Sequence, residues 1–529
     1  MKCIGLRAWE RDGCLNWKAS YGLAALSGIL LLLSVPPFRF GGFLAWVAFV
    51  PILIALFYET RVKRMERLAK IAGLGSLPFF LWFAWWIPDL LSLAHLEHLF
   101  WLWFVIGLAL AILFAIGFYG DDALKYWKAK HLPSKSLPYL PSSLQLFVIP
   151  LAVAGIEFLA MNIPGVMRIG GFFGFFSVAK TQWLNPPIMH LASFTGMYGV
   201  TFLVLLVNCA IAYGIIHYRE TRRIFKPAIA AFCLFVLAFS YGWVSIPSEK
   251  EGDTVVTVIQ VPPMEGEDTD ALYMGLSDEA LKYDPQIIIW PWLSLEGLSI
   301  NPHENFSREH NVCLAGGAEG SSGPGFGCGV LSPSGKMSID YLGYHMATIP
   351  YYATKDIKGF FFPEVHSLNT GLGKIGIVDC MESASTLPTR DRVKDGAQFL
   401  IVPTGTPNSH VFSWALGTNA IYRAVEHRTF AVEVIGDHDA SMLIDPYGRI
   451  IDDIAPEPEI VAGKISFTGD RTFYSRHGDV FGWTIVGLFL ALIGYNLYLK
   501  RKTPYVFCKK CRAQIEKGTK VCPECGKKQ

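Results

Sequence analysis

This chain of 529 residues lacks three features, and each absence excludes a class of protein. It has little net charge: the formal value is +2, so the composition offers no bulk attraction for nucleic acid. Its cysteines lack a disulfide-like rhythm, because seven of the eleven are scattered and the other four lie in the last 22 residues. No cleavable signal peptide is evident, so the first apolar run, which starts near Tyr21, is expected to remain as a span.

Apolar residues, by contrast, are abundant and gather in long blocks. Hydrophobic residues make up 52% of the chain, and the mean hydropathy is +0.35. A membrane-spanning helix needs about 20 mostly apolar residues. Eight blocks meet that need: Tyr21–Phe38, Gly41–Tyr58, Ile71–Leu91, Leu99–Tyr119, Leu144–Met161, Ala192–Ile216, Pro227–Ile246 and Val480–Leu499.

The loops between these blocks predict their orientation. Lysine and arginine collect in every second loop, at residues 61–70, 125–135, 219–226 and 500–502, whereas Ser92–His98 has neither and the turn after the first block has only Arg39. Basic loops prefer the cytoplasmic side. We therefore expect a multi-pass protein of the cell inner (cytoplasmic) membrane with residues 1–20 and 503–529 in the cytoplasm, a seven-span domain over 21–246, an external domain over 254–467 and an eighth span over 480–499.

Two membrane features have open interpretations. The segment Asn162–Pro187 is too polar to span, and its glycine and phenylalanine run at 170–176 suits either a re-entrant segment lining a cavity or a loop resting on the bilayer. Glu157 falls inside the fifth span, where a carboxylate is costly. It is either a functional group or a hydrogen-bonding partner of a neighbouring helix.

The external segment has the pattern of an α/β fold. Short β-branched runs alternate with helix-like segments such as Asp278–Tyr283 and Ser413–His427. The runs are Val255–Val261, Gln286–Trp290, Lys374–Asp379, Phe399–Pro403, Thr429–Ile435 and Ser441–Asp445. Because α/β folds build their sites where strands end, Trp290-Pro291-Trp292 and Asp379-Cys380-Met381-Glu382 are the positions of interest.

The order of these strand ends resembles the nitrilase (carbon-nitrogen hydrolase) superfamily, in which a Glu follows a strand-ending Trp-Pro, a Lys comes next, and a Cys is followed two residues later by Glu. Cys380 and Glu382 match that nucleophile motif. The chain as a whole resembles the bacterial apolipoprotein N-acyltransferases. The matching segments are Leu33–Phe38, Leu44–Leu53, Gly199–Asn208, Arg423–Glu426 and Ile444–Arg449.

The resemblance covers roughly residues 20 to 500 and implies an eight-span helical bundle with a four-layer αββα sandwich. It implies further that Cys380 takes an acyl chain from a phospholipid as a thioester and passes it to the amino group of a lipoprotein's diacylglyceryl-cysteine, with no cofactor for catalysis. The substrates would be phospholipid and lipoprotein, reached through the membrane.

The chain departs from the family at two positions of the triad. Trp292 stands where the family has Glu, and His345 stands where it has Lys, while a second Glu position falls on Ala353. A thiol near pKa 8.5 is only a few per cent ionised at neutral pH and needs a base. His345 is the candidate base or cationic donor, since imidazole titrates near neutrality. Glu296 and Glu319, the latter in a glycine-rich segment (316–329) expected to be a flexible loop beside the site, are alternative bases.

Three functions remain open at this point. One is acyl transfer through a rewired Cys380–His345 pair with Glu382. Another is a catalytically inactive scaffold that binds lipid, lipoprotein or a partner protein. A third, a nitrilase-like amidase with a different substrate, is disfavoured by the lipid-type membrane half. Cys313 and Cys328 are expected to be core thiols.

The end of the chain carries a separate motif. Cys508-x2-Cys511-x10-Cys522-x2-Cys525 is a pair of Cys-x2-Cys knuckles, and such spacing predicts a tetrahedral structural zinc site. Disulfides are disfavoured because the tail is expected in the reducing cytoplasm. About 27 residues bury little core, so the metal must stabilise this ribbon, whose expected role is structural or the binding of a cytoplasmic protein partner.

Overall fold

The computed structural model describes most of the chain. The main ranges are 17–36, 38–62, 142–162, 177–248, 252–260, 269–291, 300–319, 326–341, 364–404, 410–435, 441–453 and 459–502. Shorter described pieces are 10–11, 14–15, 70–71, 73–75, 174, 505–507, 514–516, 518, 520–522 and 526–528. Most of the predicted spans Ile71–Leu91 and Leu99–Tyr119 lie outside the described residues.

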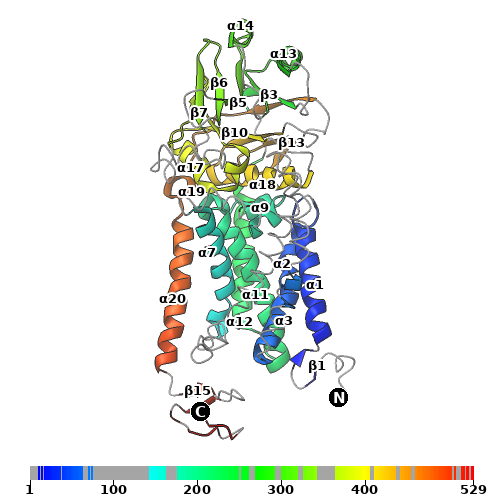
Figure 1. The fold of residues 1–529 in the computed structure, drawn as a ribbon, viewed down its shortest axis with the longest axis vertical. Coiled ribbons are helices and arrows are strands. Elements are labelled where there is room, and N and C mark those ends of the chain that lie inside the picture. The colour runs from blue at the N-terminus through cyan, green and yellow to red at the C-terminus, as the bar shows by residue number, and fades with distance from the viewer. Residues whose placement is uncertain are drawn as a thin grey trace, which may run out of the picture.

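A helical bundle forms the lower half of the molecule in Figure 1. Its longer helices are α1 (Trp17–Ser34), α3 (Val50–Val62), α7 (Val148–Asn162), α11 (Met197–Thr221), α12 (Lys226–Ser245) and α20 (Val480–Lys502). Within the described residues, four helical segments are long and apolar enough to cross a membrane: Ser143–Asn162, Met197–Thr221, Lys226–Ser245 and Val480–Leu499. The apolar helices at the first two predicted spans, Lys18–Ser34 and Gly42–Tyr58, are shorter. The chain is a membrane protein.

Helix α11 is the centre of this bundle. It packs against α7, α12 and α3. Of its apolar stretch of 18 residues, 72% is buried, compared with 11% of the corresponding stretch of α12 and 17% of that of α20. The predicted sixth span, Ala192–Ile216, was placed five residues too early. Gly196 adopts φ +65°, which breaks the helix and leaves residues 192–195 as the separate short helix α10 (Ala192–Thr195).

Two six-stranded sheets make up the α/β domain. The first has the order β14-β3-β4-β5-β6-β7, and the second β13-β12-β11-β10-β9-β8. The first comprises β3 (Thr254–Gln260), β4 (Ile287–Ile289), β5 (Cys313–Glu319), β6 (Phe326–Leu331), β7 (Met337–Tyr341) and β14 (Glu459–Ile465). The second comprises β8 (Leu368–Asn369), β9 (Lys374–Ile377), β10 (Phe399–Thr404), β11 (Phe430–Ile435), β12 (Met442–Ile444) and β13 (Ile450–Asp453).

The layers follow from which side chains share a core. Residues of both sheets, such as Val258, Ile289, Ile377 and Val432, form one buried cluster, so the sheets pack face to face. The other side of the first sheet is covered by α13 (Thr269–Ala280) and α14 (Ile300–His310). The second sheet is covered by α17 (Thr386–Lys394) and α18 (His410–His427). The domain is therefore a four-layer αββα arrangement.

The loop prediction for the glycine-rich segment 316–329 is wrong at both of its ends. Residues 316–319 belong to β5 and residues 326–329 to β6, and these strands form an antiparallel pair in which Gly316 faces Gly329. Strand β5 also pairs with β4. The hydrogen bonds of an interior strand outweigh the weak strand propensity of glycine, so residues 316–319 and 326–329 are strands, while residues 320–325 lie outside the described residues.

The α/β domain rests directly on the bundle, and one buried core runs through both. Phe158, Met197 and Tyr198 of the bundle share a cluster with Ile421 of α18 and Leu400 of β10. Figure 1 shows α18 and α17 between the sheets and the helix ends. The helical layer of the second sheet is thus also the interface with the membrane half.

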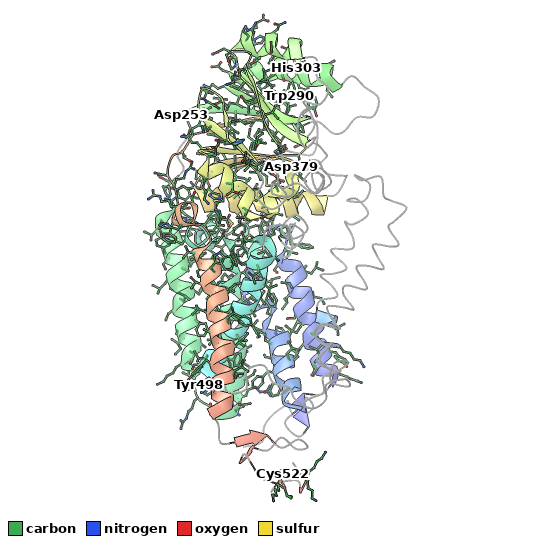
Figure 2. All side chains as sticks on the ribbon, turned by 60° about the vertical axis from the view of Figure 1, so that its left-hand side comes forward. Asp253, Trp290, His303, Asp379, Tyr498 and Cys522 are labelled. Carbon is green, nitrogen blue, oxygen red and sulfur yellow. The ribbon has the colours of Figure 1, made fainter. Side chains whose placement is uncertain are left out.

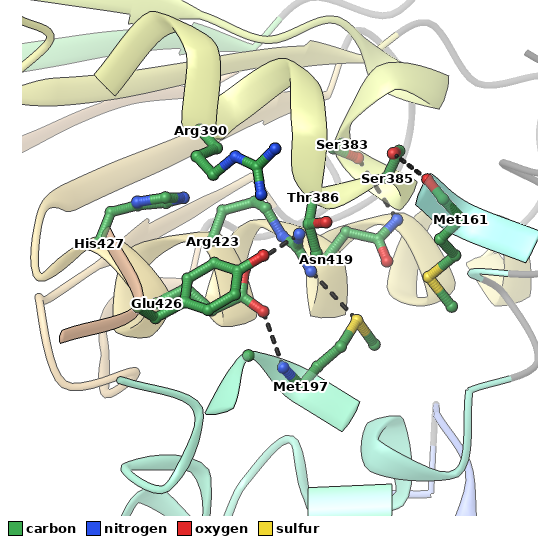
Figure 3. A network of polar contacts seen from close by, with 12 residues as sticks. Met161, Met197, Ser383, Ser385, Thr386, Arg390, Asn419, Arg423, Glu426 and His427 are labelled. Atoms are coloured by element: carbon green, nitrogen blue, oxygen red, sulfur yellow. Dashed lines mark hydrogen bonds and ion pairs between the residues drawn. The ribbon is translucent and has the colours of Figure 1, made fainter. Parts of the chain in front are cut away.

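Glu426 of α18 makes a buried polar contact across this interface. Its Oε1 accepts a hydrogen bond of 2.8 Å from the backbone N of Met197, the first residue of α11, and its Oε2 lies 3.0 Å from Arg423 Nη1 (Figure 3). A carboxylate at a helix N-terminus satisfies a free N–H and interacts favourably with the helix dipole. Burial raises the pKa of Glu426 to about 7, against the opposing charge of Arg423.

Candidate active site

Cys380 lies just beyond the end of β9, an interior strand of the second sheet next to the edge strand β8. Strand β9 stops at Ile377, Val378 N still donates to Ile401 O of β10 at 2.8 Å, and the short helix η6 (Cys380–Ala384) begins two residues later. Ser383 Oγ donates to Cys380 O at 2.6 Å and fixes the turn. The thiol is 7% exposed. Strands β9, β10 and β11 are parallel, so Cys380 occupies the sheet edge at which α/β folds build sites.

The residue before Cys380 is a second buried group. Asp379 is completely buried, and Figure 2 labels it at the level where the sheets meet the helical layer. Burial raises the pKa of the Cys328 thiol well above its ordinary value, and the charge of Asp379 raises it further. Cys328 and Cys313 are both buried, as expected of core thiols.

Glu382 belongs to a buried ion network. Its Oε2 lies 3.1 Å from Arg392 Nη1, and Arg392 Nε donates to Asp340 Oδ2 at 2.8 Å. Burial opposes the charge of Arg392, yet the two neighbouring carboxylates raise its pKa above its ordinary value. For Asp340, burial raises the pKa while Arg392 opposes the rise. The network joins the turn of Cys380 to α17 and to β7 of the other sheet.

The turn of Cys380 is also bonded to the ends of the membrane helices. Ser385 Oγ donates to Met161 O at 2.9 Å, and Thr386 Oγ1 donates to Asn162 Oδ1 at 2.9 Å. From α18, Asn419 Nδ2 donates to Ser383 Oγ at 3.3 Å. Figure 3 shows these residues in one layer between the domain and the bundle. Cys380 is therefore positioned at the boundary with the membrane half.

The short helix η3 (Val178–Gln182) is a second joint of this boundary, and it explains Glu157. The carboxylate of Glu157 accepts from Val178 N at 3.0 Å, from Ser177 Oγ at 3.0 Å and from Thr201 Oγ1 at 2.7 Å. In the structure Glu157 thus holds η3 against α7 and α11, which agrees with its interpretation as a hydrogen-bonding partner of neighbouring helices. Tyr422 OH of α18 in turn donates to Ala179 O at 2.6 Å.

Lys180 of η3 reaches into the α/β domain. Its Nζ donates to Ala415 O of α18 at 2.8 Å, and the side chain is buried. Glu433 of β11 is buried on the same side of the sheet and accepts from Thr404 Oγ1 at 3.2 Å. Burial lowers the pKa of Lys180, and that of Glu433 is raised by burial to about 8; the attraction between the two charges opposes both shifts.

Neither Lys180 nor Glu433 was predicted from the sequence to be a site residue. Their signals were a lysine within the polar segment Asn162–Pro187 and a carboxylate within an otherwise apolar strand. Neither signal reveals its partner, which is about 250 residues away along the chain.

Several predicted site residues lie outside the described residues. They are Trp292, Glu296, His345 and Ala353 at the external site, and Cys508, Cys511 and Cys525 in the tail. Glu319 is described only as the last residue of β5, so its side chain is not placed. The two-residue contact between Cys380 and His345 remains a prediction.

The tail is described in part. Strands β15 (Tyr505–Phe507) and β16 (Gln514–Glu516) pair antiparallel. Cys522 is buried, its N donates to Lys527 O at 2.9 Å, and Gly526 N donates back to Cys522 O at 2.9 Å with φ +68° at Gly526. This tight turn surrounds the second predicted knuckle. Among the residues that are placed, no group of three or more metal-ligating side chains occurs.

Comparisons with known proteins agree with this architecture. Residues 27–210 match the family model of the apolipoprotein N-acyltransferase N-terminal domain. An apolipoprotein N-acyltransferase of Geobacter metallireducens is 25% identical over 531 aligned positions, which cover 89% of this chain and 94% of the relative. The chain is thus similar in sequence to an apolipoprotein N-acyltransferase over most of its length, and its residues 27–210 are similar to the N-terminal domain of that family.

Solved structures give more remote likenesses. An amidase variant from Nesterenkonia sp. AN1, with acrylamide added at its active-site cysteine, has a TM-score of 0.34 and 16% identity, covering 42% of this chain and 96% of its own. A crystal structure of an amidase from Nesterenkonia sp. has a TM-score of 0.34 and 15% identity, covering 44% and 96%. The αββα layers themselves are evident from the shared cores of the two sheets.

Proposed function

We propose that the chain is a membrane-bound N-acyltransferase that moves an acyl chain from a phospholipid to the N-terminal amine of a lipoprotein. The placement of Cys380 carries the proposal. Its turn is hydrogen-bonded to the last residues of α7, so the thiol lies where a lipid ester and a membrane-anchored amine both arrive. The family match over residues 27–210 and the Geobacter relative's name support the same activity.

The reaction has two balanced steps. The Cys380 thiolate attacks a fatty-acyl ester carbonyl of the phospholipid, the C–S bond forms, the C–O bond breaks, and the released lysophospholipid oxygen takes a proton. The lipoprotein amine then attacks the thioester, the C–N bond forms, and the C–S bond breaks with return of a proton to sulfur. Splitting one acyl transfer into two steps is the purpose of a covalent nucleophile.

Different roles are assigned to the two residues proposed beside Cys380. His345, at the family's lysine position, is the proton acceptor for the thiol and the donor to the leaving oxygen. Glu382, whose carboxylate pairs with buried Arg392, is a positioning residue that fixes η6. Removing one partner of a buried pair leaves an uncompensated charge, so the network makes the turn rigid.

Reconstituted acyl transfer tests the proposal. The full chain in phospholipid vesicles, given a diacylglyceryl lipoprotein peptide, should form the N-acylated peptide. Cys380→Ser should abolish this product, and His345→Ala should slow it by about 10²–10⁴-fold, the usual contribution of a general acid–base. Cys313→Ser is the matched control, because a serine keeps the donor to Thr370 O that the thiol supplies at 3.4 Å. Product from Cys380→Ser, or none from the wild type, would leave only the binding-scaffold function.

The orientation and the tail complete the proposal. The alternating basic loops support an inner-membrane protein with the α/β domain outside and both termini in the cytoplasm.

The tail is proposed to bind one structural zinc through Cys508, Cys511, Cys522 and Cys525, in a ribbon that binds a cytoplasmic protein. A membrane-impermeant thiol reagent should leave Cys508 unmodified in intact cells and modify it after permeabilisation in the presence of a zinc chelator. Modification in intact cells would reverse the orientation.

A further inference from the structure

The loop between α1 and the short helix η1 (Gly42–Leu44) has a fixed shape. Backbone hydrogen bonds run from Phe38 N to Val35 O at 3.2 Å, from Gly41 N to Phe38 O at 3.1 Å and from Leu44 N to Gly41 O at 2.8 Å. Gln182 Nε2 of η3 donates to Gly42 O at 2.8 Å. A Cβ on Gly42 would lie 2.6 Å from Thr181 O, so the loop packs directly on the backbone of η3.

This rigid loop displays an unusual set of side chains. Phe38, Phe40 and Phe43 are 43%, 90% and 70% exposed. Between them stands Arg39, whose guanidinium carbon lies 5.0 Å from the ring centre of Trp414 on α18. Trp414 in turn contacts Trp183, with ring centroids 5.3 Å apart. The cation therefore lies against Trp414 of the α/β domain, which contacts Trp183 at the end of η3, while the rings of Phe38, Phe40 and Phe43 are exposed.

The loop lies at the end of the bundle that faces the α/β domain, where we infer the lipid headgroups to be. It follows the domain-side end of α1, and η1 contacts η3 beside the domain-side ends of α7 and α11. Exposed aromatic rings are suited to the membrane interface. A guanidinium on an aromatic face presents donors in a fork that matches phosphate oxygens. The guanidinium of Arg39 is complementary to the phosphate of a lipid, and the surrounding phenylalanine rings are complementary to its acyl chains.

Helix α18 connects this cluster to the proposed nucleophile. Asn419, which bonds to the turn of Cys380 through Ser383, is five residues from Trp414, or about 7.5 Å along the helix axis. We propose that Arg39, Trp414 and the rings of Phe38, Phe40 and Phe43 form a binding site for the phosphate of a glycerophospholipid. The inference rests on the proposed acyl transfer for its purpose, because it identifies where the acyl donor is recognised.

Lipid binding without turnover tests the site. The full chain with Cys380→Ser is titrated in detergent with a phosphatidylglycerol and with the diacylglycerol of the same chains, and bound lipid is counted by native mass spectrometry. Arg39→Gln should weaken phosphatidylglycerol binding about tenfold and Arg39→Lys less, because a charged phosphate contact is lost or becomes monodentate. Diacylglycerol binding should not change. Arg223→Gln is the control, an exposed arginine beyond the opposite end of α11.

The outcomes separate this site from the catalytic proposal. Equal phosphatidylglycerol binding by Arg39→Gln and the control, or an equal loss of diacylglycerol binding, overturns the site. Displacement of the lipid by millimolar inorganic phosphate also overturns it, because that result indicates a small-anion site. Arg39-dependent binding in a protein that forms no acyl-enzyme leaves the lipid site standing while the acyl-transfer function fails. If Arg39→Gln with Cys380 intact forms the acyl-enzyme at the same phospholipid concentration as the wild type, the acyl-transfer function stands and the lipid site fails.

Discussion

Lys180 is a single side chain that joins the two halves of the molecule, and Glu433 is a buried carboxyl group whose charge acts on it. The amine comes from the membrane half and bonds to Ala415 O of α18, and the carboxylate comes from β11 beneath that helix. Gly417 of α18 packs closely over this site: a Cβ there would lie 2.0 Å from Met442 Cε and 3.3 Å from Glu433 Oε2. Both groups have lost their hydration on burial, and the attraction of each for the other opposes the resulting pKa shift.

Single replacement and double replacement should therefore differ. We expect Lys180→Met and Glu433→Gln each to lower the free energy of unfolding by about 3 kcal/mol, because each leaves a buried partner uncompensated. The double variant should lose less than the sum, by at least about 1 kcal/mol. Thermal unfolding of the purified protein measures all three, and Lys282→Met on the exposed surface is the control. Strict additivity would show that the two groups do not interact.

At this scale the sequence alone predicts the proposed nucleophile, Cys380, but only part of its environment. Cys380 and Glu382 were found because a motif places them next to one another in the chain. The ion pair of Glu382 with Arg392, and its extension to Asp340, joins residues of different elements. Only the packing of the two sheets brings those residues together, and no local pattern encodes it.

At the scale of elements, strands were predictable where β-branched residues dominate. The runs at Val255, Phe399 and Thr429 correspond to β3, β10 and β11 within one or two residues. Strands β5 and β6 were missed because their glycines suggest a loop, whereas both are hydrogen-bonded within a sheet. Their stability comes from pairing over a distance, which propensity does not record.

Gly196 is the element-scale feature with the sharpest consequence. It adopts φ +65°, separates α10 from α11, and packs so closely that a Cβ would lie 2.8 Å from Tyr474 Cε2. Gly196→Ala should lower the free energy of unfolding by about 1–3 kcal/mol, the cost of a left-handed backbone at a residue with a side chain.

A glycine within α11 provides the matched control for this substitution. Gly214→Ala should be neutral or slightly stabilising, because its new Cβ would meet only Ala228 Cβ at 3.8 Å. Thermal melts of the two variants in the same detergent compare them directly. Equal stability of Gly196→Ala and Gly214→Ala would contradict the assigned role of Gly196.

At the scale of the whole molecule, two sequence patterns distinguish a membrane half from an α/β half. They are the long apolar blocks and the alternation of β-branched runs with helix-like segments. The contact between the two halves was not predictable, because it is made by a 3₁₀ helix, a helix N-terminus and single polar groups such as Glu426. One continuous core through bundle, α18 and second sheet indicates that the halves act as one body around Cys380.

The tail should behave as a separate metal-dependent unit. If its four cysteines bind zinc, elemental analysis of the purified full chain should find about one equivalent, and Cys522→Ser should remove it. Metal binding supplies about 10–16 kcal/mol in isolated zinc-finger peptides, so chelation should make residues 503–529 protease-sensitive while the α/β domain stays resistant. A tail that resists protease equally well in chelator would contradict the zinc site.

The central claim is that Cys380 carries an acyl chain, and mass spectrometry of the peptide containing Cys380 tests it most directly. After incubation with a phospholipid of known chains, the wild type should show that peptide heavier by one acyl group, and hydroxylamine should remove the addition as it does for a thioester. His345→Ala should acquire it far more slowly, and Cys380→Ser should never acquire a hydroxylamine-labile group. A Cys380 peptide that stays unmodified with every phospholipid would contradict the account and leave a lipid-binding scaffold.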